Sequence, residues 1–187
     1  MIFQAKRSSS CIAPPLLSGI VRVTDLKILG VTISDDLKMS AHVKATLSSC
    51  EQSLYALRVM KTHGMHQSAI QAVFVATTLA KLLYCSPAWW GFTIACDRDA
   101  IERFLRRCQR FGYCSASCPC FAELCNKADN KLFKQILTNT DHVLHYLLPP
   151  RYESVYDLRP RRHDRAMQML VSRHHDANYT LRMLKNN

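Results

Sequence analysis

Glycine and proline are scarce in this sequence, and acidic residues are few compared with basic ones. Five glycines and seven prolines among 187 residues leave room for long helices. There are 14 acidic residues against 25 lysines and arginines, so the formal net charge is +11. The excess is spread over both halves of the chain rather than held in a tail. Such a surface favours polyanionic partners, nucleic acid first, although many basic proteins are merely soluble.

No stretch at the start of the sequence resembles a secretory signal. The first residues, MIFQAKRSSS, lack the apolar run of about 7–15 residues that such a signal carries after its charges. Without that context, the nine cysteines are interpreted as reduced thiols of a cytoplasmic or nuclear protein that is not secreted. Because 48% of the residues are hydrophobic, disorder throughout the chain is not expected. The length suits one domain of ordinary size, with or without a small appendage.

The stretch from Ser68 to Phe92 is the one around which we expect the chain to be built. Ser68 and Gln71 form a capping-box pattern, and apolar residues then follow on all sides of the predicted helix. A helix of this kind is normally buried on several sides. Gln71 and Lys81 interrupt it and Pro87 ends it, so we expect a central core helix that falls short of a membrane span.

Strand character is confined to residues 19–34. Ile20–Val23 and Lys27–Ile33 are predicted as two short strands with Thr24–Leu26 at the bend. Gly30, inside the second run, indicates a bulge or a close approach of the backbone.

Three further helices are predicted around the central one. The first begins with Ser40 as its cap, ends at Gly64 and packs antiparallel on the central helix. The second spans Asp97–Phe111, and the third spans Phe121–Asn139. The apolar stripe of the second comprises Ile101, Phe104, Leu105, Cys108 and Phe111.

Two groups of arginines are candidate phosphate contacts. The helix at 97–111 carries arginines at positions i, i+3, i+4 and i+7, namely Arg103, Arg106, Arg107 and Arg110. A planar guanidinium can bind two phosphate oxygens at once, but the same face could be a solvated one neutralised by Asp99 and Glu102. The second group crowds around Pro160 and comprises Arg159, Arg161, Arg162 and Arg165. It is either a phosphate-contacting loop or a solvated one.

Two other patterns are not expected to bind metal. Asp35 and Asp36 follow a strand, as the carboxylates of a two-metal site do, but only Asp25 lies upstream, so a turn is the better interpretation. The thiols of Cys114, Cys118, Cys120 and Cys125 lack the two separated pairs of a structural zinc site. We therefore expect no metal, no cofactor and no catalytic residue.

Taken together, these segments resemble the carboxy-terminal part of reverse transcriptases from LINE-type, Jockey-like non-LTR retrotransposons. The matching stretches are VTDLKILGVTIS (23–34), SLYALRVMKTHGM (53–65), QAVFVATTLAKLLYCSPAWWGF (71–92), DRDAIERFLRRCQRFGY (97–113), FAELCNKADNKLFKQIL (121–137), DHVLHYLLPPRYESVYDLRPRRHDRAM (141–167) and NYTLRML (178–184). They cover most of the chain in the expected order, and the YCSPAWW and LRPRRHDR runs are the most specific.

The resemblance implies a thumb and the region downstream of it, without the catalytic palm. The expected fold is mainly α: a thumb-like helical bundle with a short N-terminal β-hairpin and a partly irregular C-terminal segment. The expected divisions are a flexible lead (1–18), the palm-end hairpin and thumb-like helices (19–94), a helical extension (95–148) and a basic C-terminal segment (149–187). The family's catalytic Asp-Asp lies upstream of this region, so the resemblance gives Asp35 and Asp36 no catalytic role.

Three functional hypotheses follow. The first is a non-catalytic fragment of an RNA-directed DNA polymerase that retains non-specific binding of RNA or an RNA/DNA duplex through phosphate contacts. The second is a helical protein-interaction remnant that uses an exposed apolar surface. The third is an open reading frame without a selected function. No membrane partner is expected under any of them.

Overall fold

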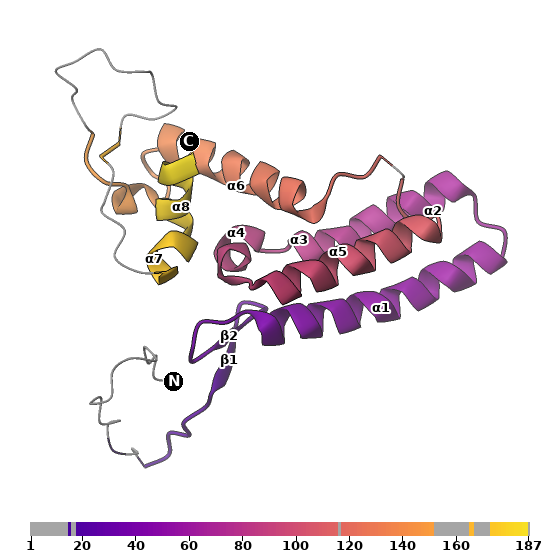
Figure 1. The fold of residues 1–187 in the computed structure, drawn as a ribbon, viewed down its shortest axis with the longest axis horizontal. Helices are drawn as coiled ribbons and strands as arrows, with labels where there is room; N and C mark the ends of the chain where they lie inside the picture. The colour runs from indigo at the N-terminus through magenta and orange to yellow at the C-terminus, as the bar shows by residue number, and fades with distance from the viewer. Residues whose placement is uncertain (1–14, 16–17, 116, 152–164, 167–172, 187) are drawn as a thin grey trace. The chain divides into compact units, whose positions relative to one another are not determined.

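The computed structural model describes residues 15, 18–115, 117–151, 165–166 and 173–186. Within these ranges the chain is mainly helical with one two-stranded hairpin near the N-terminus, which confirms the predicted fold class (Figure 1). The chain forms two compact units. The first unit is Met1–Cys85 with Phe92–Phe121, and the second unit is Ser86–Gly91 with Ala122–Asn187.

The first unit begins with an antiparallel hairpin of β1 (Asp25–Ile28) and β2 (Val31–Ser34). Leu29 and Gly30 form its two-residue loop and have positive φ angles of 47° and 87°. Such a loop twists with the strands that it joins, and glycine adopts positive φ without steric cost. The prediction of a hairpin is therefore confirmed.

The predicted positions within the hairpin are wrong. Ile20–Val23 is not a strand, and the bend lies at Leu29–Gly30 rather than at Thr24–Leu26. The sequence pattern indicates a bulge or a close approach of the backbone at Gly30. The folded chain has no bulge there and reverses its direction instead. The Tyr84 ring does approach this point closely, because a Cβ at Gly30 would lie 3.2 Å from it. The run Lys27–Ile33 has β-branched residues on both sides of the loop, and this hides the turn from a prediction based on side-chain type.

Helix α1 (Ser40–Thr62) follows and lies alongside the other long helices of the first unit (Figure 1). Its end agrees with the prediction, since Gly64 has a φ of 80° directly after the cap residue His63. Its start does not. Met39 is the N-cap and makes no side-chain capping bond, while Ser40 is the first helical residue. The Ser40 hydroxyl is used elsewhere, in a bond to Asp97.

The central stretch is helical but not continuous. It consists of α2 (Gln67–Phe74), the π-helix η1 (Val75–Leu79) and α3 (Ala80–Leu83), and it runs antiparallel to α1, as predicted (Figure 1). The predicted capping box at Ser68 is absent. Instead His66 is the N-cap, and its ring accepts a hydrogen bond from the backbone N–H of Ser68.

Burial of the central stretch is one-sided. A series at spacings of four, formed by Ile70, Phe74, Thr78 and Leu82, is at most 1% exposed. The opposite face is exposed and comprises Ala72, Val75, Ala76 and Ala80. The expectation of burial on several sides is therefore wrong: α1 packs on one side, and the small side chains of the other side remain accessible.

By length and composition the helical run Gln67–Phe92 could cross a membrane, because it has 26 residues and an 18-residue window with a mean hydropathy of 1.4. In the structure 28% of that window is buried. The expectation that it falls short of a span is not supported by this criterion. Core helices of water-soluble proteins meet the same criterion, and the structure breaks the run at Tyr84 and Cys85.

Helix α5 (Ala95–Arg110) completes the first unit. Its predicted stripe is confirmed at Ile101, Phe104, Leu105 and Cys108, which are buried. Phe111, however, is 53% exposed, because the helix ends at Arg110 and the positive φ of Gly112 turns the chain away.

The second unit contains α4 (Ser86–Trp89), most of α6 (Phe121–Thr138), the 3₁₀ turn η3 (His145–Leu147), α7 (Arg173–Ala177) and α8 (Tyr179–Asn186). The short 3₁₀ helix η2 (Trp90–Phe92) crosses the boundary between the units. Phe133, Met183 and Leu184 form a buried cluster in the second unit. Against it pack Leu137, Leu148 and Tyr179.

Candidate nucleic-acid interface

The candidate interface is the basic face of α5. Arg103, Arg106 and Arg110 are exposed at positions i, i+3 and i+7, so they follow one another along one side of the helix. The buried stripe of the same helix fixes its rotation about its own axis, because Ile101, Phe104 and Cys108 must face the core. The three guanidiniums are thus presented to solvent as a row, which we call the arginine row.

Arg107 differs from the arginine row. Its Nη2 donates to Glu51 Oε1 of α1 at 2.6 Å, and its guanidinium carbon lies 5.5 Å from the ring centroid of Phe104. The ion pair and the cation–π contact hold Arg107 between α5 and α1. Of the four predicted residues on this helix, three are therefore available to a ligand and the fourth takes part in helix packing.

The two acidic residues that could neutralise this face do not pair with it within the described residues. Glu102 Oε1 accepts a hydrogen bond from the backbone N–H of Phe121 at 2.7 Å. Asp99 contacts Arg103 through its backbone carbonyl, which accepts from Nε at 3.2 Å. Over the same ranges no salt bridge joins a carboxylate to Arg103, Arg106 or Arg110.

An open hollow of about 500 Å³ adjoins the row. It is lined by Cys96, Asp99, Arg103 and Arg106, all from α5. Arg103 and Arg106 thus border this hollow, and Asp99 adds a negative charge to its lining.

Residues from α1 and the start of α2 fix the C-terminal end of α5. Lys61 Nζ donates to the Phe111 carbonyl at 2.8 Å and lies 5.8 Å from the ring centroid of Tyr113. The side-chain amide of Gln67 donates to the Gly112 carbonyl. The sequence pattern places Lys61 only in the last turn of its own helix. Nothing in that local pattern signals its contact with a helix end 50 residues downstream.

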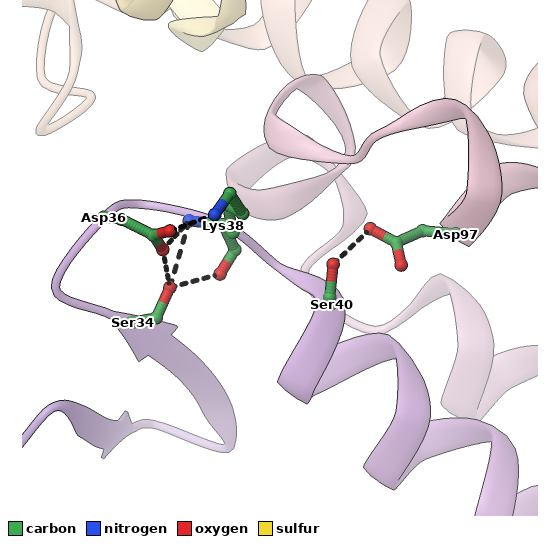
Figure 2. Close-up of polar contacts among 5 residues, drawn as sticks. All are labelled: Ser34, Asp36, Lys38, Ser40 and Asp97. Carbon is green, nitrogen blue, oxygen red and sulfur yellow. Dashed lines mark hydrogen bonds and ion pairs between the residues drawn. The ribbon is translucent and has the colours of Figure 1, made fainter. Parts of the chain in front are cut away.

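At the N-terminal end of α5, Asp97 joins the helix to the start of α1 (Figure 2). Its Oδ2 accepts from the Ser40 hydroxyl at 2.9 Å and from the Ile94 backbone N–H at 3.3 Å. The carboxylate thereby satisfies a backbone donor at the helix start and also suits the positive end of the helix dipole. The helix that carries the arginine row is therefore held at both ends by contacts with α1 and the start of α2.

The second predicted group of arginines belongs to the second unit. Arg159, Arg161 and Arg162 lie outside the described residues. Arg165 forms an isolated antiparallel bridge with Arg151, and its Nη1 donates to the Pro149 carbonyl at 3.2 Å. The described part of this group is thus half-buried and engaged with the backbone.

Asp35 and Asp36 lie in a turn, as the favoured interpretation predicted. Figure 2 shows the contacts of Asp36. Asp36 Oδ1 accepts from the Ser34 hydroxyl at 2.6 Å and from the Lys38 N–H at 3.2 Å, and Oδ2 pairs with Lys38 Nζ. The bonds to Lys38 and Ser34 lower the pKa of Asp36 to about 2. Asp36 is thus fully engaged in closing the turn.

The cysteines offer no preformed metal site in the described ranges, where no group of three or more His, Cys, Asp or Glu side chains is placed to hold an ion. Burial, with the neighbouring Cys118 thiol, raises the pKa of Cys114 to about 12. In the metal-free chain a thiol with this pKa is protonated at neutral pH.

Comparison with known proteins gave no match to a family model, to a curated protein or to a solved structure.

Proposed function

We propose that this chain is a non-catalytic, thumb-like module of a non-LTR retrotransposon reverse transcriptase that binds nucleic acid through its phosphate backbone. The observation that carries the proposal is the arginine row. Its three exposed guanidiniums lie along one side of α5, and no carboxylate is paired with them among the described residues. The net charge of +11 and the resemblance of the sequence to that family support it.

The chemistry of the row is suited to phosphate recognition. Successive positions along one helix face at these spacings are about 5–6 Å apart, which is of the order of the spacing between phosphates along a strand. Each guanidinium can bind two oxygens of one phosphate. Phosphate contacts carry no direct sequence information, so binding through the row should be independent of sequence.

Binding of the purified full chain to a fluorescein-labelled RNA, an RNA/DNA duplex and a DNA duplex of equal length, measured by fluorescence anisotropy over a series of salt concentrations, tests the proposal. We expect affinities that are similar between unrelated sequences and fall steeply with salt. Absence of binding at low salt, or binding that does not respond to salt, would contradict it. Primer extension should be absent, because the proposed module lacks the palm carboxylates.

A protein-interaction role is the second candidate, and a specific observation favours it. The exposed face of α2 to α3 carries Ala72, Val75, Ala76 and Ala80, with Val75 52% exposed, so a helix could pack closely against it. The two candidates differ in their response to salt. Contacts between apolar faces persist at high salt, whereas contacts with phosphates do not.

A further inference from the structure

The hairpin presents one strand edge that the described chain does not cover. All four residues of β1 are exposed, and Leu26 and Ile28 are 41% and 48% exposed. Leu29, at the loop, is 85% exposed. An exposed edge strand with apolar side chains is a template for pairing with another strand, and two strands alone are marginally stable in water.

The edge of β2, by contrast, is occupied. The Thr32 N–H donates to Nδ1 of His42 in α1 at 3.4 Å, and the Ser34 carbonyl accepts from the Leu37 N–H at 3.0 Å. His42 is 6% exposed, so the start of α1 closes this side of the hairpin. Any added strand must therefore pair with β1.

The register of the hairpin determines which backbone groups of β1 face outward. The two-residue loop makes Ile28 and Val31 a hydrogen-bonded pair, and alternation makes Leu26 and Ile33 the next one. The bond from the Asp35 N–H to the Thr24 carbonyl, 2.8 Å long, continues this alternation. The N–H and C=O groups of Asp25 and Lys27 consequently point away from β2. Among the described residues these groups have no backbone partner.

We propose that β1 pairs antiparallel with β1 of a second copy of this chain, with Leu26 on the two-fold axis. In this register Asp25 lies opposite Lys27 of the partner subunit, and Lys27 lies opposite Asp25 of the partner subunit. Both are outward-facing positions, so the two pairs exchange four backbone hydrogen bonds. The same register places Leu26 against Leu26 of the partner subunit on the apolar face.

Charge selects this register over its neighbours. Because outward-facing residues must oppose one another, the register can shift only in steps of two. One such shift sets Asp25 opposite the partner's Asp25, and the other sets Lys27 opposite the partner's Lys27. Directly opposed like charges are destabilising, and opposite charges are stabilising. The strand is thus self-complementary about Leu26, as a two-fold interface requires.

Sedimentation velocity of the full chain and of charge-reversal variants tests this pairing. The interface is small, so we expect a weak dimer that forms as the concentration rises through the micromolar range. Asp25→Lys and Lys27→Asp should each weaken dimerisation by roughly tenfold or more, because both cross-strand pairs become repulsive. The double variant Asp25→Lys/Lys27→Asp should restore it. An equimolar mixture of the two single variants should also dimerise, since each chain then faces the opposite charges.

The controls separate pairing from a general effect of charge. Lys27→Asp lowers the positive net charge and Asp25→Lys raises it, so an effect of overall repulsion alone would change dimerisation in opposite directions. Lys44→Asp, at an exposed position of α1, should leave dimerisation close to the wild-type value apart from that general effect. Equal circular dichroism spectra confirm the fold of each variant. A monomer at all concentrations, self-association that both single reversals leave intact, or no recovery in the double variant would overturn the proposal.

Discussion

Arg182 of α8 donates through Nη2 to Asp129 Oδ2 of α6 at 2.8 Å, and both side chains are largely buried, 14% and 3% exposed. The Tyr179 hydroxyl adds a bond to the Asp129 backbone carbonyl at 2.8 Å. Tyr179 also packs against the cluster of Phe133, Met183 and Leu184. The ion pair and these contacts join the C-terminal helix to α6 within the second unit.

Removing one member of this pair should destabilise the second unit strongly. Arg182→Met leaves the Asp129 carboxylate buried without its partner, which costs about 3–5 kcal/mol in comparable buried pairs. The double variant Asp129→Asn/Arg182→Met removes both charges and should cost less than Arg182→Met alone. The free energy of unfolding in urea, followed by circular dichroism, measures both. Equal losses in the single and double variants would show that the charge pairing is unimportant.

The bond between Ser40 and Asp97 should contribute to the stability of the first unit. Asp97→Ala removes the hydrogen bond to Ile94 N–H at the start of α5 together with the bond from Ser40, and we expect a loss of about 2 kcal/mol. Ser40→Ala removes the second bond alone and should cost about 1 kcal/mol. Ser48→Ala, at an exposed position of α1, is the matched control and should have little effect. If Ser40→Ala and Ser48→Ala proved equally neutral, the contact would have no energetic role.

Acid should remove the contribution of Asp36. Its pKa in the folded chain, about 2, lies below the usual value of 3.8, so its hydrogen bonds to Ser34 and Lys38 stabilise the fold fully at pH values well above 3.8. This stabilisation declines below pH 3.8 and is lost as the pH falls through about 2. The difference in unfolding free energy between the wild type and Asp36→Asn should therefore be constant near neutral pH and shrink as the pH falls from 3.8 through 2. Asp35→Asn is the matched control, because the Asp35 side chain takes no part in these bonds. A difference independent of pH would contradict the assignment.

Much of the fold was predictable from the spacing of apolar residues and from the glycine that ends a helix. Apolar spacing located α1, α5 and α6, and Gly64 marked the end of α1 because helices commonly end in a residue with positive φ. The helix starts were less predictable. Ser40 and Ser68 have good capping side chains, but the Ser40 hydroxyl bonds to Asp97, 57 residues away. A tertiary partner of this kind is invisible to local pattern.

The candidate site was predictable in position but not in detail. Helical spacing placed four arginines on one face, and a sequence cannot show which of them a neighbouring helix engages. Glu51 of α1 pairs with Arg107, and Glu102 bonds to the Phe121 backbone rather than to an arginine. The hairpin bend was missed for a different reason: Leu29 adopts a φ of 47°, a conformation that a leucine rarely takes.

The salt dependence of RNA binding by arginine variants tests the central claim most directly. The triple variant Arg103→Gln/Arg106→Gln/Arg110→Gln removes the arginine row, and Arg107→Gln is the matched control, because Arg107 is paired with Glu51. Each phosphate that is no longer neutralised should reduce the slope of log affinity against log salt by roughly 0.7 to 0.9, so the slope of the triple variant should be smaller by about 2 to 3. The triple variant should also bind all sequences more weakly. Arg107→Gln should keep the wild-type slope. If the folded triple variant retains the wild-type affinity and slope, the arginine row is a solvated surface, and α5 is not a nucleic-acid interface.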